Sequence, residues 1–374
     1  MKRFLLMLSF CLCFLSFLAQ DDIRVASQVK VATWNVEWLS CEENGPLDEN
    51  KQMNNVATVI NGLNLDIVVL EEVGTSSSYK TIDTLVKRLG SGWAGKIYAS
   101  TEGNCWQNQG IIWKTSKASF VSGQLLANNA GSSYNWSSGR WPVLYNMNIL
   151  ADGTQIPVSF VVIHAKAYSD VESYMRRRNA STSLKTLLDG NSYNSKNLMI
   201  IGDFNDYLNG TQCSDYSDSP YKNFMDDAPN YKGITSGIYH NIDNIVISNE
   251  LFNNYVANSA KKETTAQNLV SNFGTTTSDH LPVSAVFSFF DESAVEDLIE
   301  DDRIVIYPNP VETELFVTKL GQNGNKMGTK WEIYDVSGKL QLVTTLSQKI
   351  NVIDLNPGIY LLKIDNNIIK FVKK

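Results

Sequence analysis

This sequence has no excess of basic charge, few cysteines and few long apolar runs. The formal net charge is −7, which argues against a broad basic surface for nucleic acid. An enzyme that meets phosphates through a metal ion is still allowed, because the ion then supplies positive charge locally. The 5 cysteines lack the spacing of metal-binding motifs, so no structural zinc site is expected.

The longest apolar run, residues 4–18, lies near the N-terminus and is shorter than a full bilayer span. Lys2 and Arg3 precede it and Ala19 follows it. A basic start, an apolar middle and a small residue at the cut are typical of a signal peptide. We therefore expect residues 1–19 to be a signal peptide, since the run is too short for the alternative, a stable membrane span.

Removal of that segment would leave Cys41, Cys105 and Cys213. Export permits a disulfide, but three cysteines leave one over. We expect Cys41 to pair with Cys105, because both fall in predicted loops that could face the same rim.

An acidic stretch poor in aromatics, residues 291–302, is expected to be an exposed linker. It would separate a large domain, residues 20–290, from a small one, residues 303–374. The small part has short alternating segments separated by turn signals, such as Ser-Gly-Lys at 337–339 and Asn-Pro-Gly at 356–358. This pattern predicts a small antiparallel β-sandwich.

The tail resembles the C-terminal sorting domain of type IX secretion substrates. The matching segments are Ile-Tyr-Pro-Asn-Pro at 306–310, Tyr-Asp-Val-Ser-Gly at 334–338, Leu-Asn-Pro-Gly-Ile-Tyr at 355–360 and the Lys-rich end at 370–374. The resemblance implies a type IX secretion machinery as partner and a secreted or cell-surface location. The alternative is a carbohydrate-binding or adhesive sandwich, which would need an exposed aromatic platform, whereas these aromatics alternate as core positions do.

The large domain alternates helical and strand-like segments. Apolar spacing predicts helices over residues 50–61, 79–89 and about 170–188. Residues 66–73 form a continuous apolar strand, as expected when both faces are buried. Several other strands are joined by short turns, so we expect an α+β fold, a four-layer α/β/β/α sandwich of two mixed β-sheets.

Polar residues follow these predicted strands. The clearest case is residues 199–206, where an apolar run meets a glycine and then Asp203, Asn205 and Asp206. Strand ends can hold such side chains toward a ligand, although a plain turn explains each one alone. We interpret Asp206 as a turn residue. The full set is Asn35, Glu72, His164, Asp203, Asn205, Asp243, Asp279 and His280.

In this order, the set resembles the endonuclease/exonuclease/phosphatase superfamily, which includes DNase I-like nucleases. The matching motifs are Trp-Asn-Val at 34–36, Leu-Glu-Glu-Val at 70–73, Ile-His at 163–164, Gly-Asp-Phe-Asn at 202–205, Ile-Asp at 242–243 and Ser-Asp-His at 278–280. Three positions depart from the family pattern: Glu71 stands in place of the usual Gln, Ala165 in place of Leu, and Asn244 in place of Tyr. These departures leave the subfamily open.

The resemblance implies a Mg²⁺ site, with Mn²⁺ or Ca²⁺ as alternatives. Glu72 is the best single ligand, a hard carboxylate at a strand end. Asn35 and Asp279 would help directly or through water. Such an ion neutralises phosphate oxygens during phosphodiester hydrolysis.

The remaining roles follow the same resemblance. His280 would act as general base or as a charged donor to the scissile phosphate, oriented by Asp243. Asp203 would accept the proton of water or hold a second metal. Asn205 and His164 would donate to phosphate oxygens.

Arg140 is a weaker substrate-binding candidate, since a guanidinium fork suits a phosphate but a surface arginine before a strand is an equal alternative.

Taken together, these features predict a secreted, monomeric, divalent-metal-dependent phosphodiester hydrolase, an extracellular nuclease acting on DNA and/or RNA. Trp106, Trp136 and Trp141 fall in predicted loops where they could stack on bases. One alternative is a phosphatase or phosphodiesterase for small phosphoesters or phospholipid head groups. A second alternative is a non-catalytic surface binding protein on the same fold.

Overall fold

The computed structural model describes residues 27–41, 43–75, 81–99, 103–127, 129–151, 153–289, 303–320, 331–344, 349–364 and 367–374. The predicted signal peptide and acidic linker lie outside these ranges. The chain divides into two compact units, Met1–Phe290 and Asp291–Lys374, and each is described by itself.

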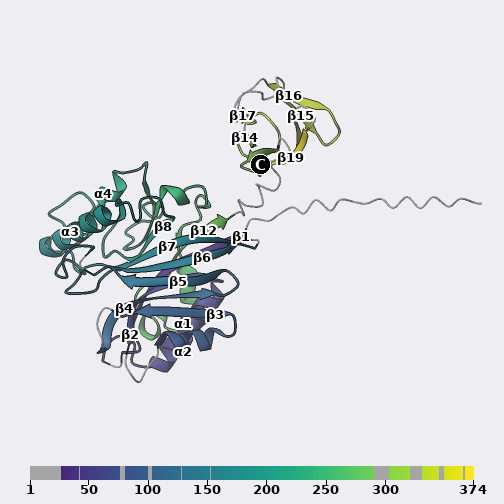
Figure 1. Cartoon of the computed structure of the whole chain (residues 1–374). Helices are drawn as coiled ribbons and strands as arrows, with labels where there is room; N and C mark the ends of the chain where they lie inside the picture. The colour runs from purple at the N-terminus through teal and green to yellow at the C-terminus, as the bar shows by residue number, and fades with distance from the viewer. Residues whose placement is uncertain are drawn as a thin grey trace, which may run out of the picture. The chain divides into compact units, whose positions relative to one another are not determined.

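The large unit is built on two six-stranded sheets (Figure 1). The first has the order β11-β12-β1-β2-β4-β3, with bounds Lys261–Lys262, Val283–Phe289, Ser27–Leu39, Ile67–Thr75, Gly103–Lys114 and Trp93–Tyr98. The second has the order β5-β6-β7-β8-β10-β9, with bounds Ala118–Leu125, Val143–Ala151, Thr154–His164, Leu198–Asp203, Asp243–Ser248 and Tyr231–Gly233. The β1–β2 and β7–β8 pairs are parallel and the other pairs antiparallel, so both sheets are mixed.

Three apolar cores separate four layers. Side chains of both sheets, such as Val69 and Phe160, form the central core between the sheets. The helices α1 (Glu49–Gly62) and α2 (Thr81–Leu89) pack on the outer face of the first sheet. The longer α3 (Val171–Leu188) packs on the outer face of the second, with the short α4 (Lys222–Met225) nearby (Figure 1). The predicted four-layer α/β/β/α sandwich is confirmed.

Local sequence sets the ends of these helices. Asp48 and Asp170 precede α1 and α3, and each carboxylate accepts a backbone N–H of the first turn. Helix α1 ends at Gly62, where the helical pattern was predicted to stop. A second short helix, α5 (Phe273–Thr276), leads into the segment that carries His280.

Strand register brings the polar strand ends together. His164 of β7 lies opposite Asp203 of β8, and Asp203 lies opposite Asp243 of β10. These three residues therefore form one row across the second sheet. In the first sheet, Asn35 lies opposite Glu71, next to Glu72.

The small unit contains a three-stranded and a four-stranded antiparallel sheet. The first combines β13 (Arg303–Tyr307), β14 (Glu314–Leu320) and β17 (Lys349–Asn351), and the second combines β16 (Leu340–Thr344), β15 (Trp331–Asp335), β18 (Gly358–Ile364) and β19 (Asn367–Lys373). Buried side chains such as Leu315, Trp331 and Phe371 form its core. This arrangement confirms the predicted C-terminal β-sandwich.

Candidate active site

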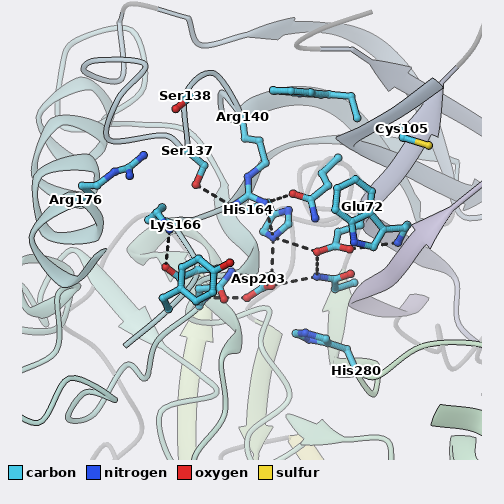
Figure 2. A pocket seen from close by; sticks show the side chains of 17 residues that line it. Glu72, Cys105, Ser137, Ser138, Arg140, His164, Lys166, Arg176, Asp203 and His280 are labelled. Carbon is cyan, nitrogen blue, oxygen red and sulfur yellow. Dashed lines mark hydrogen bonds and ion pairs between the residues drawn. The ribbon is translucent and has the colours of Figure 1, made fainter. Parts of the chain in front are cut away.

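The strand ends of both sheets open on one pocket with a volume of about 470 Å³ (Figure 2). Seven of the residues predicted from the sequence line it: Asn35, Glu72, Arg140, His164, Asp203, Asn205 and His280. The other two, Asp243 and Asp279, lie beside His280. The structure therefore brings the whole predicted set to one place.

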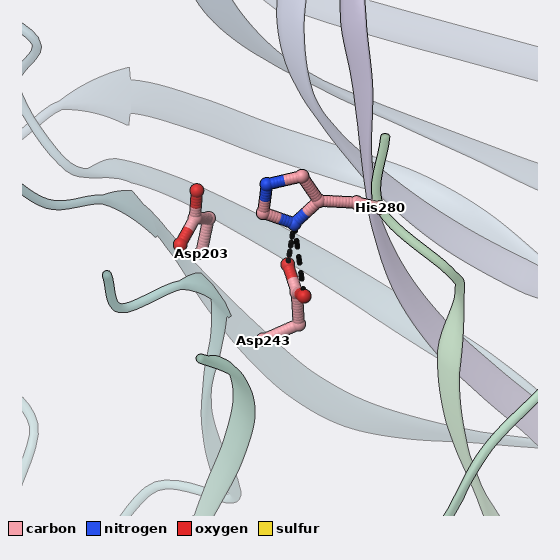
Figure 3. A group of neighbouring side chains, drawn as sticks. All are labelled: Asp203, Asp243 and His280. Atoms are coloured by element: carbon pink, nitrogen blue, oxygen red, sulfur yellow. Dashed lines mark hydrogen bonds and ion pairs between the residues drawn. The ribbon is translucent and has the colours of Figure 1, made fainter. Parts of the chain in front are cut away.

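His280 is held by Asp243 (Figure 3). Its Nδ1 atom lies 3.0 Å from each carboxylate oxygen of Asp243. The backbone around it is fixed as well, because Trp34 Nε1 donates to the His280 carbonyl and the His280 N–H donates to Ser278 Oγ. Burial lowers the pKa of His280, but the charge and hydrogen bond of Asp243 outweigh this and raise it to about 11. His280 is therefore an imidazolium at neutral pH, which makes it a donor.

Asp203 lies next to this pair and is buried. One carboxylate oxygen accepts the N–H of Asn205 at 2.8 Å, and the other accepts the side-chain amides of Asn35 and Asn205 at 3.2 and 3.1 Å. Burial raises the pKa of Asp203 to about 7, with the charge of Asp243 adding to the effect and that of His280 opposing it. A carboxylate with such a pKa can exchange a proton near neutral pH.

An irregularity in β2 separates two neighbouring carboxylates. The register of β2 with β4 shifts between Leu70 and Val73, and Glu72 has a left-handed backbone with φ of 60°. Glu72 lines the pocket, where Asn35 Nδ2 and the Trp38 N–H donate to it at 3.1 and 3.2 Å. Glu71 is instead fully buried and accepts a hydrogen bond from Thr33 Oγ1 at 3.0 Å. Burial raises the pKa of Glu71 well above the usual range, and the charges of Asp243 and Asp203 add to this effect.

His164 and Arg140 form the back of the pocket. His164 Nε2 lies 3.1 Å from Arg140 Nη1, 3.5 Å from Asp203 Oδ2 and 3.6 Å from Glu72 Oε1. Burial, with help from the Arg140 charge, lowers the pKa of His164, so its ring is neutral. Arg140 is buried and also donates to Gln107, to Ser137 Oγ and to the Ala165 carbonyl. The alternative of a surface arginine before a strand is wrong.

The donor set suits a hard divalent cation. Carboxylate oxygens of Glu72 and Asp203 face one another across the Asn35 amide, and Asp279 stands near His280 with a largely exposed side chain. The side-chain amide nitrogen of Asn35 donates to these carboxylates. Its oxygen accepts the Glu37 N–H at 3.0 Å, which leaves one oxygen lone pair for a cation. The pKa of Glu37 is raised by burial and then by the charges of Asp279 and Glu72. A divalent cation would relieve this repulsion between carboxylates.

Other residues also line the pocket. Trp38, Gln107 and Lys166 were missed by reasoning from the sequence, whereas Arg176 belongs to the run of three arginines at 176–178, whose sequence allowed either substrate contact or an exposed helix face. Of the missed residues, only Lys166 carried a usable signal, since it lies two residues after His164 at a strand end. Trp136 was predicted to stack on bases, but it is buried, with 1% of its surface exposed. Asp206 lies in a bend, and its Oδ1 accepts the backbone N–H groups of Tyr207 and Gln212 at 2.9 and 2.8 Å, but it also forms a fully buried ion pair with Arg177 that the sequence did not predict.

A disulfide borders the pocket. Cys41 and Cys105 are bonded, as predicted, and Cys105 and its neighbour Trp106 line the pocket. Cys105 lies in β4, not in a loop. Cys213 is a free, buried cysteine.

Comparison with known proteins gives two family matches. Residues 32–280 match the endonuclease/exonuclease/phosphatase family, and residues 305–374 match a secretion system C-terminal sorting domain. Comparison with curated proteins found no match. The described part of the chain has no helix with the length and apolar character needed to cross a membrane.

Solved structures share the fold at low sequence identity. The human nocturnin catalytic domain with a bound sulfate anion is 16% identical, with a TM-score of 0.50, and the match covers 72% of this chain and 97% of that one. An endonuclease/exonuclease/phosphatase from Beutenbergia cavernae is 14% identical, with a TM-score of 0.51, and the match covers 92% of this chain and 99% of that one. One from Bacteroides vulgatus is 14% identical, with a TM-score of 0.50, and the match covers 71% of this chain and 100% of that one.

The C-terminal unit is thus a type IX secretion sorting domain, which implies export. Members of the family matched by the large unit are phosphoester hydrolases, and the strand-end carboxylates, amides and histidines of this chain line one pocket. By its large unit, the chain belongs to the endonuclease/exonuclease/phosphatase family.

Proposed function

We propose that this protein is a secreted, divalent-metal-dependent phosphodiester hydrolase that cleaves nucleic acid, DNA and/or RNA. The observation that carries the proposal is the Asp243–His280 pair beside Asp203, opposite the Glu72 carboxylate, at the base of an open pocket. A cationic hydrogen-bond donor (His280), a proton acceptor (Asp203) and a hard metal ligand (Glu72) thus line the same pocket.

Glu72 would hold Mg²⁺, with Asn35 and Asp279 contributing directly or through water; Mn²⁺ and Ca²⁺ are alternatives. When bound, the cation neutralises charge on the nonbridging phosphate oxygens and favours deprotonation of water.

Side chains of the protein would then donate hydrogen bonds to the phosphate and accept the proton of the attacking water. His280, held as an imidazolium by Asp243, donates to a nonbridging oxygen and stabilises the charge that develops there. Asp203 takes the proton of the attacking water, a role that suits a pKa of about 7. Asn205 reorients its amide from the Ala165 carbonyl, 3.2 Å away, toward the phosphate. His164 and Arg140 contact another phosphate oxygen at the back of the pocket.

A nucleic acid is favoured over a small phosphoester by aromatic rings in the site pocket and in a second pocket, which Tyr207, Tyr239 and His240 line. Trp38 and Trp106 line the pocket. Close in sequence to Asn205 and Asp243, the ring of Tyr207 stacks on His240 at 4.9 Å, and His240 stacks on Tyr239 at 3.7 Å. Tyr239 is 82% exposed. An exposed aromatic on a supported stack suits a nucleobase.

We also propose the chain organisation predicted from the sequence: a signal peptide at 1–19, a catalytic domain at 20–290, a linker at 291–302 and a sorting domain at 303–374, in a monomeric protein.

The test is a substrate panel of plasmid DNA, single-stranded DNA, RNA and a simple phosphomonoester, each with Mg²⁺ and with EDTA. We expect Mg²⁺-dependent cleavage of at least one nucleic acid, lost in His280→Ala. Cleavage of the phosphomonoester alone would replace the proposal with a phosphatase. No cleavage of any substrate would favour a non-catalytic binding protein.

A further inference from the structure

The pocket has a cationic side that the proposed hydrolysis leaves unused. Lys166 and Arg176 line the same cavity as Glu72 and His280, and they lie on the other side of His164 from Glu72 (Figure 2). Lys166 comes from the segment after β7, and Arg176 comes from α3. The chain as a whole carries a net charge of −7, so this local excess of positive charge runs against its overall balance.

The Lys166 ammonium forms no direct ion pair among the described residues, and Asp170 acts on it only from beyond that distance. Its Nζ atom donates to the Ala167 carbonyl at 3.1 Å and lies 4.3 Å from the centre of the Tyr168 ring. In the part of the chain that the structure describes, no carboxylate lies within ion-pair distance of it. Burial lowers its pKa, the charges of Arg176 and Arg140 lower it further, and the charge of Asp170 partly opposes them. Two donor positions of this ammonium therefore remain for a ligand.

Arg176 is preorganised next to it. Its Nε and Nη2 atoms donate to the Tyr134 carbonyl at 2.9 and 2.5 Å, and its guanidinium lies 4.2 Å over the Tyr134 ring. Its ion pair with Glu172 is loose, at 3.7 Å, and Glu172 is largely exposed. Such a weak surface pair neutralises little of the Arg176 charge inside the pocket.

We propose that Lys166 and Arg176 form a second anion subsite, which binds a phosphate of the substrate other than the one that is cleaved. This inference rests on the proposed function, since it assigns the scissile phosphate to the Glu72, Asp203 and His280 side of the pocket. The anion is either the next phosphate along a polynucleotide or a terminal phosphate of a short nucleotide. Both offer the oxygens that an ammonium and a guanidinium bind best.

Dinucleotides test the subsite. Three substrates share one internal phosphodiester: one has no other phosphate, one has a 5′-terminal phosphate and one has a 3′-terminal phosphate. We expect one terminal phosphate to raise kcat/KM about tenfold, as a charge-assisted contact would. We call the kcat/KM with the terminal phosphate divided by the kcat/KM without it the phosphate ratio. In Lys166→Met this ratio falls toward one, whereas Lys166→Arg retains most of it. Arg178→Met, an exposed position on the same helix, keeps the ratio of the natural protein.

An oligonucleotide without terminal phosphates distinguishes the two possible occupants of the subsite, the next backbone phosphate and a terminal phosphate. If Lys166→Met loses more kcat/KM on internal cleavage of this oligonucleotide than on the plain dinucleotide, the neighbouring backbone phosphate occupies the subsite. If the two losses are equal while the ratio for a phosphorylated dinucleotide falls, the terminal phosphate occupies it. A natural protein with no preference for either phosphorylated dinucleotide, or a preference that survives in Lys166→Met, would overturn the inference.

Calorimetric titration of inorganic phosphate into the full chain in EDTA gives a readout apart from activity. We expect Lys166→Met to bind phosphate about tenfold more weakly than the natural protein and Arg178→Met to bind it equally well. Lys166-dependent phosphate binding without hydrolysis of any nucleotide would reject the nuclease function and retain the subsite. Hydrolysis with no Lys166-dependent binding or preference would retain the nuclease and reject the subsite.

Discussion

Arg177 and Asp206 form an ion pair fully shielded from solvent, with Arg177 Nη2 2.7 Å from Asp206 Oδ2. Arg177 also donates to the carbonyl oxygens of Lys166 and Tyr168, both at 2.7 Å. Asp206 accepts the hydroxyl of Thr211 at 2.9 Å. The pair thus ties α3 to the loops that follow β7 and β8, the strands that end in His164 and Asp203.

Removing the Arg177 cation should therefore destabilise the large unit. Arg177→Met leaves the Asp206 carboxylate buried without its partner, and such a loss typically costs about 3–5 kcal/mol. Denaturant unfolding measures it, with Arg178→Met as the matched exposed control, expected within about 0.5 kcal/mol of the natural protein. Equal unfolding midpoints for the two variants would mean that the buried pair contributes nothing net.

The Asp243–His280 contact predicts a kinetic effect without loss of fold. Asp243→Asn removes the charge that keeps His280 protonated, so we expect kcat to fall by about 10²–10⁴-fold, the usual range for acid–base groups. Asp218→Asn, at an exposed carboxylate on the surface, serves as the control. The measurement is the initial rate on the best substrate of the panel. Full activity in either Asp243→Asn or His280→Ala would show that the assigned chemistry is wrong.

The raised pKa of Asp203 predicts how metal-free stability depends on pH. Its folded value of about 7 lies above the usual 3.8, so its contribution is present below pH 3.8 and is lost as pH rises through 7. The pKa of His280 is about 11, above the usual 6.5. Its contribution to stability is therefore also present below pH 6.5 and is lost as pH rises toward 11. Melting in EDTA should therefore occur at lower temperature at pH 8 than at pH 5.

Divalent cations should reverse this trend, because they bind the deprotonated carboxylates. We expect the rise in Tm on adding Mg²⁺ to be several degrees larger at pH 8 than at pH 5, and to shrink in Asp203→Asn. A Tm rise that is equal at both pH values would show that ionisation of Asp203 does not strengthen metal binding by Glu72 and its neighbours.

The Cys41–Cys105 disulfide closes a loop with a sequence separation of 64 residues and borders the pocket at Cys105. Its removal in the double variant Cys41→Ser, Cys105→Ser should cost about 2–4 kcal/mol. It should also raise KM more than it lowers kcat, because Trp38 and Trp106 lose a tie between their segments. Cys213→Ala, which leaves the bond intact, is the control. An unchanged KM would limit the disulfide to a stabilising role.

Tyr239 distinguishes nucleic acid from small phosphoesters as substrate. Tyr239→Ala removes the exposed end of the three-ring stack, and loss of one stacked base costs about 1–3 kcal/mol. We expect KM for single-stranded nucleic acid to rise while the rate on a small phosphodiester without bases is unchanged. Equal effects on both substrates would argue against base stacking at this position.

The parts of the site that could be predicted from the sequence are those set by local pattern. Apolar strands ending in polar residues located His164, Asp203 and Asp243, and strand register then placed them in one row. The parts that could not be predicted depend on distant partners. Asp206 looked like a turn residue because its partner, Arg177, lies 29 positions away on a helix and charged residues are usually exposed.

The same reason explains the other errors. Trp136 follows a polar stretch typical of a loop, but tertiary packing buries it in the core outside the second sheet, and its Nε1 donates to the Ala130 carbonyl. Lys166 and Arg176 belong to different elements, so only the folded chain shows that they share a wall of the pocket.

The left-handed backbone of Glu72, with φ of 60°, lowers the stability of the fold at a residue that is proposed to bind the metal. A residue with a Cβ atom held in this conformation costs about 1 kcal/mol or more relative to glycine. Glu72→Gly should therefore relax the backbone while it removes the carboxylate from the pocket. A chain selected only for resistance to heat would tend to lose this glutamate, so its presence marks a position where function has been kept at the expense of stability.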